Sequence, residues 1–149
     1  MATLKQIEEF LASQPFAMAG VSRNPKKFGY TAFFELKERG MNVVPVNPYA
    51  GEINGVKAYP DIKSLPLEIR GLIIVTPKTV TAALVKEAVI KGIRQIWIQQ
   101  KSEYNEVFEE LKDASINYIT GQCILMHYRP RNVHKFHGKL KKLFRMFPK

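Results

Sequence analysis

Apolar residues in the first third of the chain alternate between helical spacing and unbroken runs. Leu4, Ile7 and Phe10 recur at helical spacing, which predicts an amphipathic helix. The continuous run "FAMAGV" predicts a buried strand, because a strand covered on both faces has no polar side. A second helical pattern ends at Gly40, as helices often end at glycine, and the apolar run "NVVPV" follows it. The predicted order is a helix over 4–11, a strand over 16–21, a helix over 31–40 and a strand over 42–46.

The same alternation recurs in the rest of the chain. Pro77 stands where a helix could begin, and Val80, Leu84, Val85 and Ala88 form a helical stripe after it. The predicted elements are a strand over 71–76, a helix from 77 to 92, a strand over 94–99, a helix over 103–114 and a strand over 116–119. Five strands that alternate with helices predict an α/β fold, a Rossmann-like doubly wound parallel sheet in three layers, α/β/α.

Length and composition predict one globular domain rather than two. The chain has 149 residues, of which 46% are hydrophobic and 11% aromatic. No apolar run approaches the roughly 20 residues of a membrane-spanning helix, and acidic residues stand where a secretory signal would be apolar. The single cysteine, Cys123, leaves no internal disulfide and no thiolate pair for zinc. These features predict a cytoplasmic protein.

The net charge of +10 is a property of the C-terminal end. Residues 127–149 hold eight of the 23 basic residues and no acidic one, which leaves 15 basic against 13 acidic residues before them. The sequence therefore divides into a nearly neutral domain, 1–126, and a basic tail, 127–149. The tail has helical apolar spacing at Val133, Phe136, Leu140, Leu143, Phe144 and Phe147.

A basic amphipathic helix in the tail admits several partners. It can pack on its own domain or on a second copy in a homodimer, with the basic face in solvent. It can also bind an anionic membrane surface or an acidic protein partner. Nucleic acid is the least favoured partner, since the tail carries no motif that reads bases.

The loop after the first predicted strand has the features of an anion-binding site. Gly20 allows a sharp turn, and a helix that begins near Gly29 or Tyr30 would point free N–H groups and its positive dipole end into the same space. A hydroxyl and three basic side chains lie between these positions: Ser22, Arg23, Lys26 and Lys27. A phosphate or pyrophosphate suits such a loop. The simpler interpretation is a tight strand-to-helix turn with its lysines in solvent.

The loop differs from the usual dinucleotide fingerprint. The spacing is G-x-S rather than G-x-G-x-x-G, and Asn47 stands where NAD-binding proteins carry an acidic residue for the ribose. NAD is therefore disfavoured. NADP remains an alternative because basic side chains could hold its extra phosphate. Coenzyme A also fits, since it carries a pyrophosphate and a 3′-phosphate.

Four segments together resemble a known family. "AGVSRNPKKFGYTAFFELKERG" with "VVPVNP", "IIVTP" and "IWIQ" is similar to small CoA-binding proteins that resemble the N-terminal Rossmann-like domain of the succinyl-CoA synthetase α subunit. The resemblance covers roughly residues 16–126. Many relatives have a longer, glycine-containing turn after the fourth strand, where this chain has "QQKSEYN".

The resemblance implies a set of residues for binding CoA or an acyl-CoA. Around the phosphates it implies Gly20, Val21, Ser22, Arg23, Lys27, Phe28, Gly29 and Tyr30. Beside the nucleotide it implies Pro45, Asn47 and Pro48, and after the third strand Val75, Thr76 and Pro77. For the pantetheine arm it implies the amides of Gln99 and Gln100, whose other interpretation is simple surface exposure.

Catalytic chemistry finds little support in the sequence. All three histidines, His127, His134 and His137, lie in the basic tail, where we interpret them as structural or solvated rather than as metal ligands. Cys123 is interpreted as a small buried hydrophobic residue, with a mixed disulfide to CoA as the alternative. The resemblance implies binding without the synthetase's second, phosphoryl-transferring domain. The prediction is a non-catalytic CoA carrier, sensor or regulatory module; an NADP-binding oxidoreductase-like protein and an interaction protein that acts through its tail are the alternatives.

Overall fold

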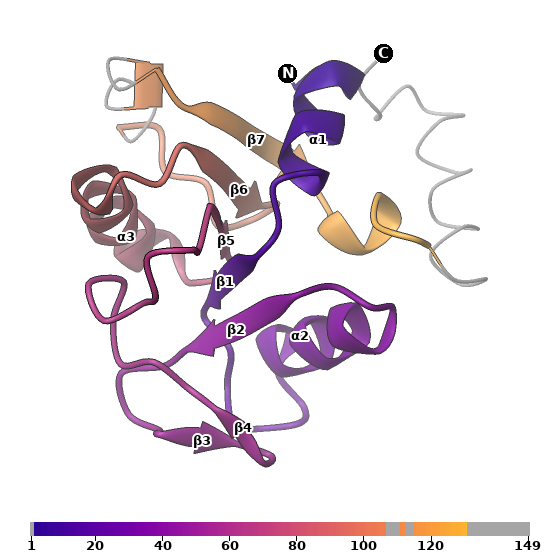
Figure 1. The fold of residues 1–149 in the computed structure, drawn as a ribbon, viewed down its shortest axis with the longest axis vertical. Helices are drawn as coiled ribbons and strands as arrows, with labels where there is room; N and C mark the ends of the chain where they lie inside the picture. The colour runs from indigo at the N-terminus through magenta and orange to yellow at the C-terminus, as the bar shows by residue number, and fades with distance from the viewer. Residues whose placement is uncertain (1, 107–110, 113–114, 131–149) are drawn as a thin grey trace.

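The computed structural model describes residues 2–106, 111–112 and 115–130 (Figure 1). Five parallel strands form one sheet in the order β2-β1-β5-β6-β7, and β3 and β4 form a separate antiparallel hairpin. The strands are β1 (Phe16–Ala19), β2 (Val43–Val46), β3 (Glu52–Ile53), β4 (Val56–Lys57), β5 (Gly71–Ile74), β6 (Gln95–Gln99) and β7 (Asn117–Gln122). The helices are α1 (Leu4–Leu11), α2 (Phe28–Glu38), α3 (Lys78–Lys91) and the short 3-10 helix η1 (Ile124–Met126).

The strand order confirms the predicted Rossmann-like α/β fold. The chain leaves β1 for its neighbour β2 at one edge, then returns to β5 on the other side of β1 and continues outward to β7. The winding direction therefore reverses between β1 and β5, and a ligand in such a sheet binds beyond the carboxyl ends of the strands at this point.

Two apolar clusters cover the two faces of the sheet. Alternate residues of β1 point to opposite faces: Phe16 and Met18 join a cluster with α1 and α2, while Ala17 and Ala19 join a cluster with α3. Figure 1 shows α3 on one side of the sheet and α2 on the other. This is the predicted three-layer arrangement.

Several element boundaries differ from the prediction. The strand predicted over 116–119 continues to Gln122, and the helix predicted to begin near Gly29 or Tyr30 begins at Phe28. The β3–β4 hairpin was not predicted at all. Its turn is Asn54-Gly55, with φ of 46° and 81°, which is the left-handed conformation that Asn-Gly hairpin turns adopt.

The helical stripe predicted after Pro77 was partly wrong. Thr81, Val85 and Ala88 are the buried residues of α3, whereas Val80 is 43% exposed. Thr81 can occupy a core position because its hydroxyl donates to the carbonyl oxygen of Ser102 at 2.7 Å. The core face of α3 therefore keeps Val85 and Ala88 from the predicted stripe and has Thr81 in place of Val80.

The last described residues pack on the domain. The buried Arg39 donates from Nη1 to the carbonyl oxygens of Leu125, at 2.7 Å, and of Tyr128, at 2.9 Å, and pairs with Glu35. The packed chain thus extends to Tyr128, and the domain boundary at 126 stays a prediction.

Two predicted helices fall partly or wholly on residues that are not described. Of the helix predicted over 103–114, residues 103–106 are not helical, residues 111–112 are helical, and the other six lie outside the described residues. The basic helix of the tail, 131–149, lies outside them entirely. None of the helices in the described part of the chain combines the length and apolarity that a membrane span requires.

Candidate functional site

Loops from four strands meet at the carboxyl edge of the sheet and enclose two hollows. The lysine hollow, of about 610 Å³, is lined by Gly20, Ser22, Lys27, Phe28, Gly29, Val75, Thr76, Pro77, Gln99, Gln100, Lys101 and Ser102. The carboxylate hollow, of about 520 Å³, is lined by Ala19, Gly20, Val21, Ser22, Val46, Asn47, Pro48, Tyr49, Pro60, Asp61, Thr76, Pro77, Val80, Ala83, Leu84 and Glu87. Both share Gly20, Ser22, Thr76 and Pro77, so they lie side by side at the winding reversal.

Glycine is required at two positions of the loop between β1 and α2. Gly20 has φ of +95°, and a Cβ there would lie only 2.6 Å from the carbonyl carbon of Val75 and 3.1 Å from the Cγ2 of Thr76. A Cβ on Gly29 would collide with the carbonyl oxygen of Gly20. The first turn of α2 is therefore packed directly on the loop, and the loop on the end of β5.

Two helix N-termini at this edge have no side-chain cap. Lys27 precedes α2 and Pro77 precedes α3, and neither side chain accepts a hydrogen bond from the first turn. In α1, by contrast, Thr3 and Gln6 form a complete capping box. The first N–H groups of an uncapped helix are free to donate to an anion, and the helix dipole favours one there.

The basic loop is shaped by its own polar side chains. The hydroxyl oxygen of Ser22 accepts from the N–H of Asn24 at 3.0 Å, and the Oδ1 of Asn24 accepts from the N–H of Lys26 at 2.9 Å. Arg23 is exposed, like Lys26 and Lys27. The hydroxyl proton of Ser22 is not used in that bond, so Ser22 can still donate to a ligand.

Asn47 joins two of the loops. Its Nδ2 donates to the carbonyl oxygen of Val21 at 2.9 Å, and its Oδ1 accepts from the N–H groups of Tyr49, at 2.7 Å, and Ala50, at 3.0 Å. Asn47 and Pro48 both line the carboxylate hollow. The side chain that replaces the NAD-type carboxylate thus holds the loop after β2 against the loop after β1.

Some predicted residues line neither hollow, among them Arg23, and others are engaged in internal bonds. Pro45 lies inside β2, and Tyr30 packs its ring on Phe34 at 4.6 Å between centroids; neither lines a hollow. Gln99 lines the lysine hollow but is only 3% exposed, and its Oε1 accepts from the N–H of Ile124 at 3.1 Å. Gln100 also lines the lysine hollow.

Two threonines fix the turn after β6. Thr81 gives its one hydroxyl proton to the carbonyl oxygen of Ser102, so the bond between the hydroxyls of Thr76 and Thr81, at 3.1 Å, has Thr76 as its donor. Thr76 is therefore an acceptor toward the hollows. The turn from Gln99 to Ser102 is tied through this pair to the start of α3.

Several lining residues were missed at the level of sequence. Tyr49 follows the predicted Asn47-Pro48 segment and donates its N–H to Asn47. Pro60 follows the unpredicted β3–β4 hairpin, whose Asn-Gly turn was the available signal. Glu87 lies on the face of α3 that also presents Val80 and Leu84 to this hollow. Lys101 and Ser102 come from the turn after β6.

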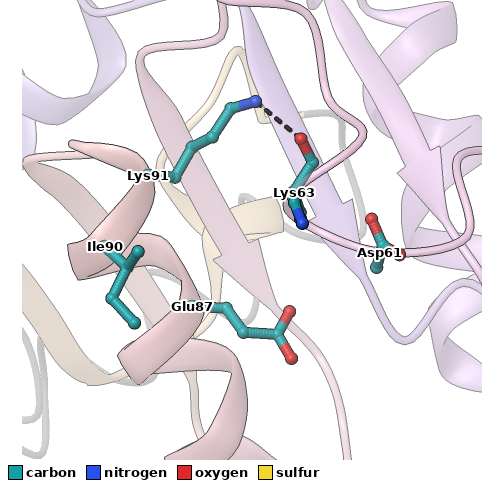
Figure 2. A pocket seen from close by; sticks show the side chains of 5 residues that line it. All are labelled: Asp61, Lys63, Glu87, Ile90 and Lys91. Atoms are coloured by element: carbon teal, nitrogen blue, oxygen red, sulfur yellow. Dashed lines mark hydrogen bonds between the residues drawn. The ribbon is translucent and has the colours of Figure 1, made fainter.

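A third hollow adjoins the carboxylate hollow and contains none of the predicted residues. It has about 650 Å³ and is lined by Asp61, Lys63, Glu87, Ile90 and Lys91. Figure 2 shows the amino group of Lys91 directed to the carbonyl oxygen of Lys63, at 2.8 Å, and away from Glu87. The ammonium group of Lys91 is thus engaged with the backbone. The third hollow also does not border the glycine loop, so it is not the predicted phosphate site.

Cys123 and His127 belong to the packed body. Cys123 is 5% exposed within the apolar cluster on the α1–α2 face, which confirms its interpretation as a buried hydrophobic residue. His127 shares a hydrogen bond with the Oε1 of Gln122 at 3.1 Å and packs near Trp97. No group of metal-ligating side chains occurs among the described residues. His134 and His137 lie outside them.

Comparisons with known proteins agree on one family. The sequence profile described as the CoA binding domain matches residues 14–129. The α subunit of the ADP-forming acetate–CoA ligase II of Pyrococcus furiosus is 39% identical over 129 residues, which are 79% of this chain and 28% of that subunit. A conserved hypothetical protein from the same organism has a solved structure with a TM-score of 0.72 at 35% identity, covering 75% of this chain and 97% of that one.

The relatives differ in length. The chain spans less than a third of the acetate–CoA ligases that it matches. An uncharacterized protein of Bacillus subtilis, YneT, is of similar size: it is 25% identical over 120 residues, which are 80% of this chain and 89% of that protein.

Proposed function

The chain belongs to the CoA-binding domain family, and from that premise we propose that it binds coenzyme A or an acyl-CoA across the two hollows. The observation that carries the proposal is the contact of Gly20, Gly29 and Val75, which brings the uncapped N-terminus of α2 to the winding reversal of the sheet. The pyrophosphate accepts from the first turn of α2 and from Ser22. Arg23, Lys26 and Lys27 supply charge for the 3′-phosphate and the pyrophosphate.

The adenosine end occupies the carboxylate hollow. This hollow has apolar walls, including Tyr49, Val80 and Leu84, which suit the faces of a purine ring. The carboxylates of Asp61 and Glu87 can accept from the amino group of adenine, and they would repel a phosphate. The charge of this hollow thus favours the base there and the phosphates at the glycine loop.

The pantetheine arm passes over Thr76 and Pro77 into the lysine hollow. The acceptor oxygen of Thr76 and the amide of Gln100 lie along this route and suit the amide groups of pantetheine. Gln99 holds the backbone of Ile124 in place and shapes the floor of the hollow.

The proposed role is that of a carrier, sensor or regulatory module. Neither hollow has a histidine or a cysteine among its described lining residues, and the hydroxyl of Ser22 is hydrogen-bonded to the N–H of Asn24 rather than to a base. The acetate–CoA ligase activity belongs to much longer proteins. For this chain we therefore propose binding rather than catalysis. The cytoplasmic location stays a prediction.

Isothermal titration with CoA, acetyl-CoA, NADP and NAD tests the proposal. Removing two phosphate contacts in Arg23→Ala/Lys27→Ala should weaken CoA binding about thirtyfold, at about 1 kcal/mol for each contact. The matched control is Lys5→Ala/Arg70→Ala, which removes the same charge from exposed positions on α1 and just before β5. CoA binding that is lost equally in both variants, or NADP binding without CoA binding, would refute the site.

A further inference from the structure

Charged side chains divide unequally between the two hollows. Of the described residues that line the lysine hollow, Lys27 and Lys101 are basic and none is acidic. Asp61 and Glu87 line the carboxylate hollow, with no lysine or arginine among its described lining residues. A ligand that spans both hollows therefore meets acceptors at one end and positive charge at the other.

Lys101 has a backbone conformation that glycine would adopt without strain. Its φ is 75°, in the left-handed region that costs a residue with a Cβ roughly 1–2 kcal/mol. The residues beside it are fixed: the N–H of Ser102 donates to the carbonyl oxygen of Gln99 at 2.9 Å, and the carbonyl oxygen of Ser102 accepts from Thr81. The conformation of this turn therefore does not require a lysine at position 101. Strained residues of this kind cluster where a side chain has a function.

Lys101 lies on the far side of the hollow from the glycine loop. The loop follows β1 and Lys101 follows β6, and β5 lies between these strands. Two strand spacings separate them, about 10 Å. If the phosphates of CoA lie on the glycine loop, the part of the ligand near Lys101 is the end of the pantetheine arm, which is uncharged in CoA itself. An acyl group attached there can supply the missing negative charge.

We propose that Lys101 binds a carboxylate at the end of the acyl chain, so that the preferred ligand is an acyl-CoA with a free carboxylate rather than CoA or a neutral acyl-CoA. This rests on the proposed function, because it takes the position of the pyrophosphate from it. Lys27, at the start of α2, remains with the phosphates. The lysine hollow thus divides its two positive charges between the two ends of the pantetheine arm.

Titration with a matched pair of ligands tests the proposal. Succinyl-CoA and butyryl-CoA have acyl chains of equal carbon number and differ in the terminal carboxylate. The full chain should bind succinyl-CoA about fivefold more tightly than butyryl-CoA, as expected for one partly exposed ion pair. Lys101→Gln should abolish this preference, because succinyl-CoA binding should fall by more than butyryl-CoA binding. High salt should reduce the preference in the unsubstituted protein.

Two further variants separate charge from folding. Lys101→Gly relieves the strain at φ 75° and removes the ammonium group, so it should fold at least as stably and still lose the preference. Lys5→Gln makes the same charge change on α1, and this variant should keep the preference for succinyl-CoA over butyryl-CoA.

Three other results of these titrations would overturn the proposal. Equal binding of the two ligands by the unsubstituted protein would overturn the proposal. If Lys101→Gln weakened CoA, butyryl-CoA and succinyl-CoA equally, Lys101 would be a phosphate contact instead. If none of the three bound to the unsubstituted protein, the proposed function itself would fail and this inference with it.

Discussion

The substitution Gly20→Ala tests the close packing on which the candidate site depends. Gly20 has φ of +95°, and its Cα faces the backbone at the end of β5 so closely that a Cβ would lie 2.6 Å from the carbonyl carbon of Val75. A main-chain carbonyl at the end of a central strand cannot rotate away as a side chain can. The loop or the strand end must move.

Two costs add in this variant. The left-handed conformation costs alanine roughly 1–2 kcal/mol relative to glycine. Overpacking against the backbone of Val75 adds about 1–3 kcal/mol. We expect the free energy of unfolding to fall by about 3 kcal/mol, which for a chain of this size lowers Tm by roughly 10 °C. CoA affinity should fall as well, because the displaced loop no longer presents the N-terminus of α2.

Urea unfolding followed by tryptophan fluorescence measures the first effect. Trp97 is the chain's single tryptophan and is fully buried in β6, so its emission reports loss of the core. Gly55→Ala is the matched control: Gly55 has φ of +81°, but a Cβ there would meet nothing within 4 Å. The free energy of unfolding of Gly55→Ala should therefore fall only by the cost of the left-handed backbone conformation, roughly 1–2 kcal/mol.

The comparison isolates the contact with Val75. Equal destabilisation by Gly20→Ala and Gly55→Ala would mean that the loop does not pack on β5 as described, and the glycine-made anion site would lose its structural basis. A large loss of stability at Gly20 with unchanged CoA affinity would uphold the packing and refute the role of the loop in binding.

Other positions give further tests. Arg39→Leu leaves two buried carbonyl oxygens without their donor and should destabilise the fold by about 3 kcal/mol in urea unfolding, whereas Arg39→Lys should recover part of this loss. Asn47→Asp keeps the acceptor oxygens but loses the bond to the carbonyl oxygen of Val21, so calorimetry should show CoA binding weakened about fivefold with the N–H bonds of the loop intact. Deleting residues 131–149 should leave CoA affinity unchanged within about twofold if the hollows carry the function; loss of binding would favour a role for the tail.

Most of the sheet was predictable because β1, β2, β5 and β6 are largely buried on both faces, whereas β7 is only half-buried. Such strands appear in the sequence as short unbroken apolar runs, and helices between them leave few alternatives to a parallel, doubly wound sheet. The β3–β4 hairpin has strands of two residues each, too short for such a run. Its Asn54-Gly55 turn was the one signal in the sequence, and Pro60, which lines the carboxylate hollow, follows this hairpin in the chain.

The orientation of α3 could not be obtained from apolar spacing. Two stripes lie next to each other on this helix: Val80, Leu84 and Glu87 face the hollow, while Thr81 and Val85 face the sheet. A threonine in the core and a valine at the hollow contradict the usual pattern, in which the apolar side chains of a helix face the core and the polar ones face outward. The threonine is explained by its bond to Ser102, which joins segments 21 residues apart in the chain.

The site owes its shape to bonds between loops rather than to any one motif. Asn47 ties the loop after β2 to the loop after β1, the glycine contact seats that loop on β5, and Thr81 ties the turn after β6 to α3. These contacts join protein groups to one another and restrain the four loops, which lowers the part of the binding free energy that is spent on arranging them. A G-x-S loop is weak evidence by itself, but here the loop is bonded to its neighbours and borders both hollows, which supports our proposal of one ligand that spans them.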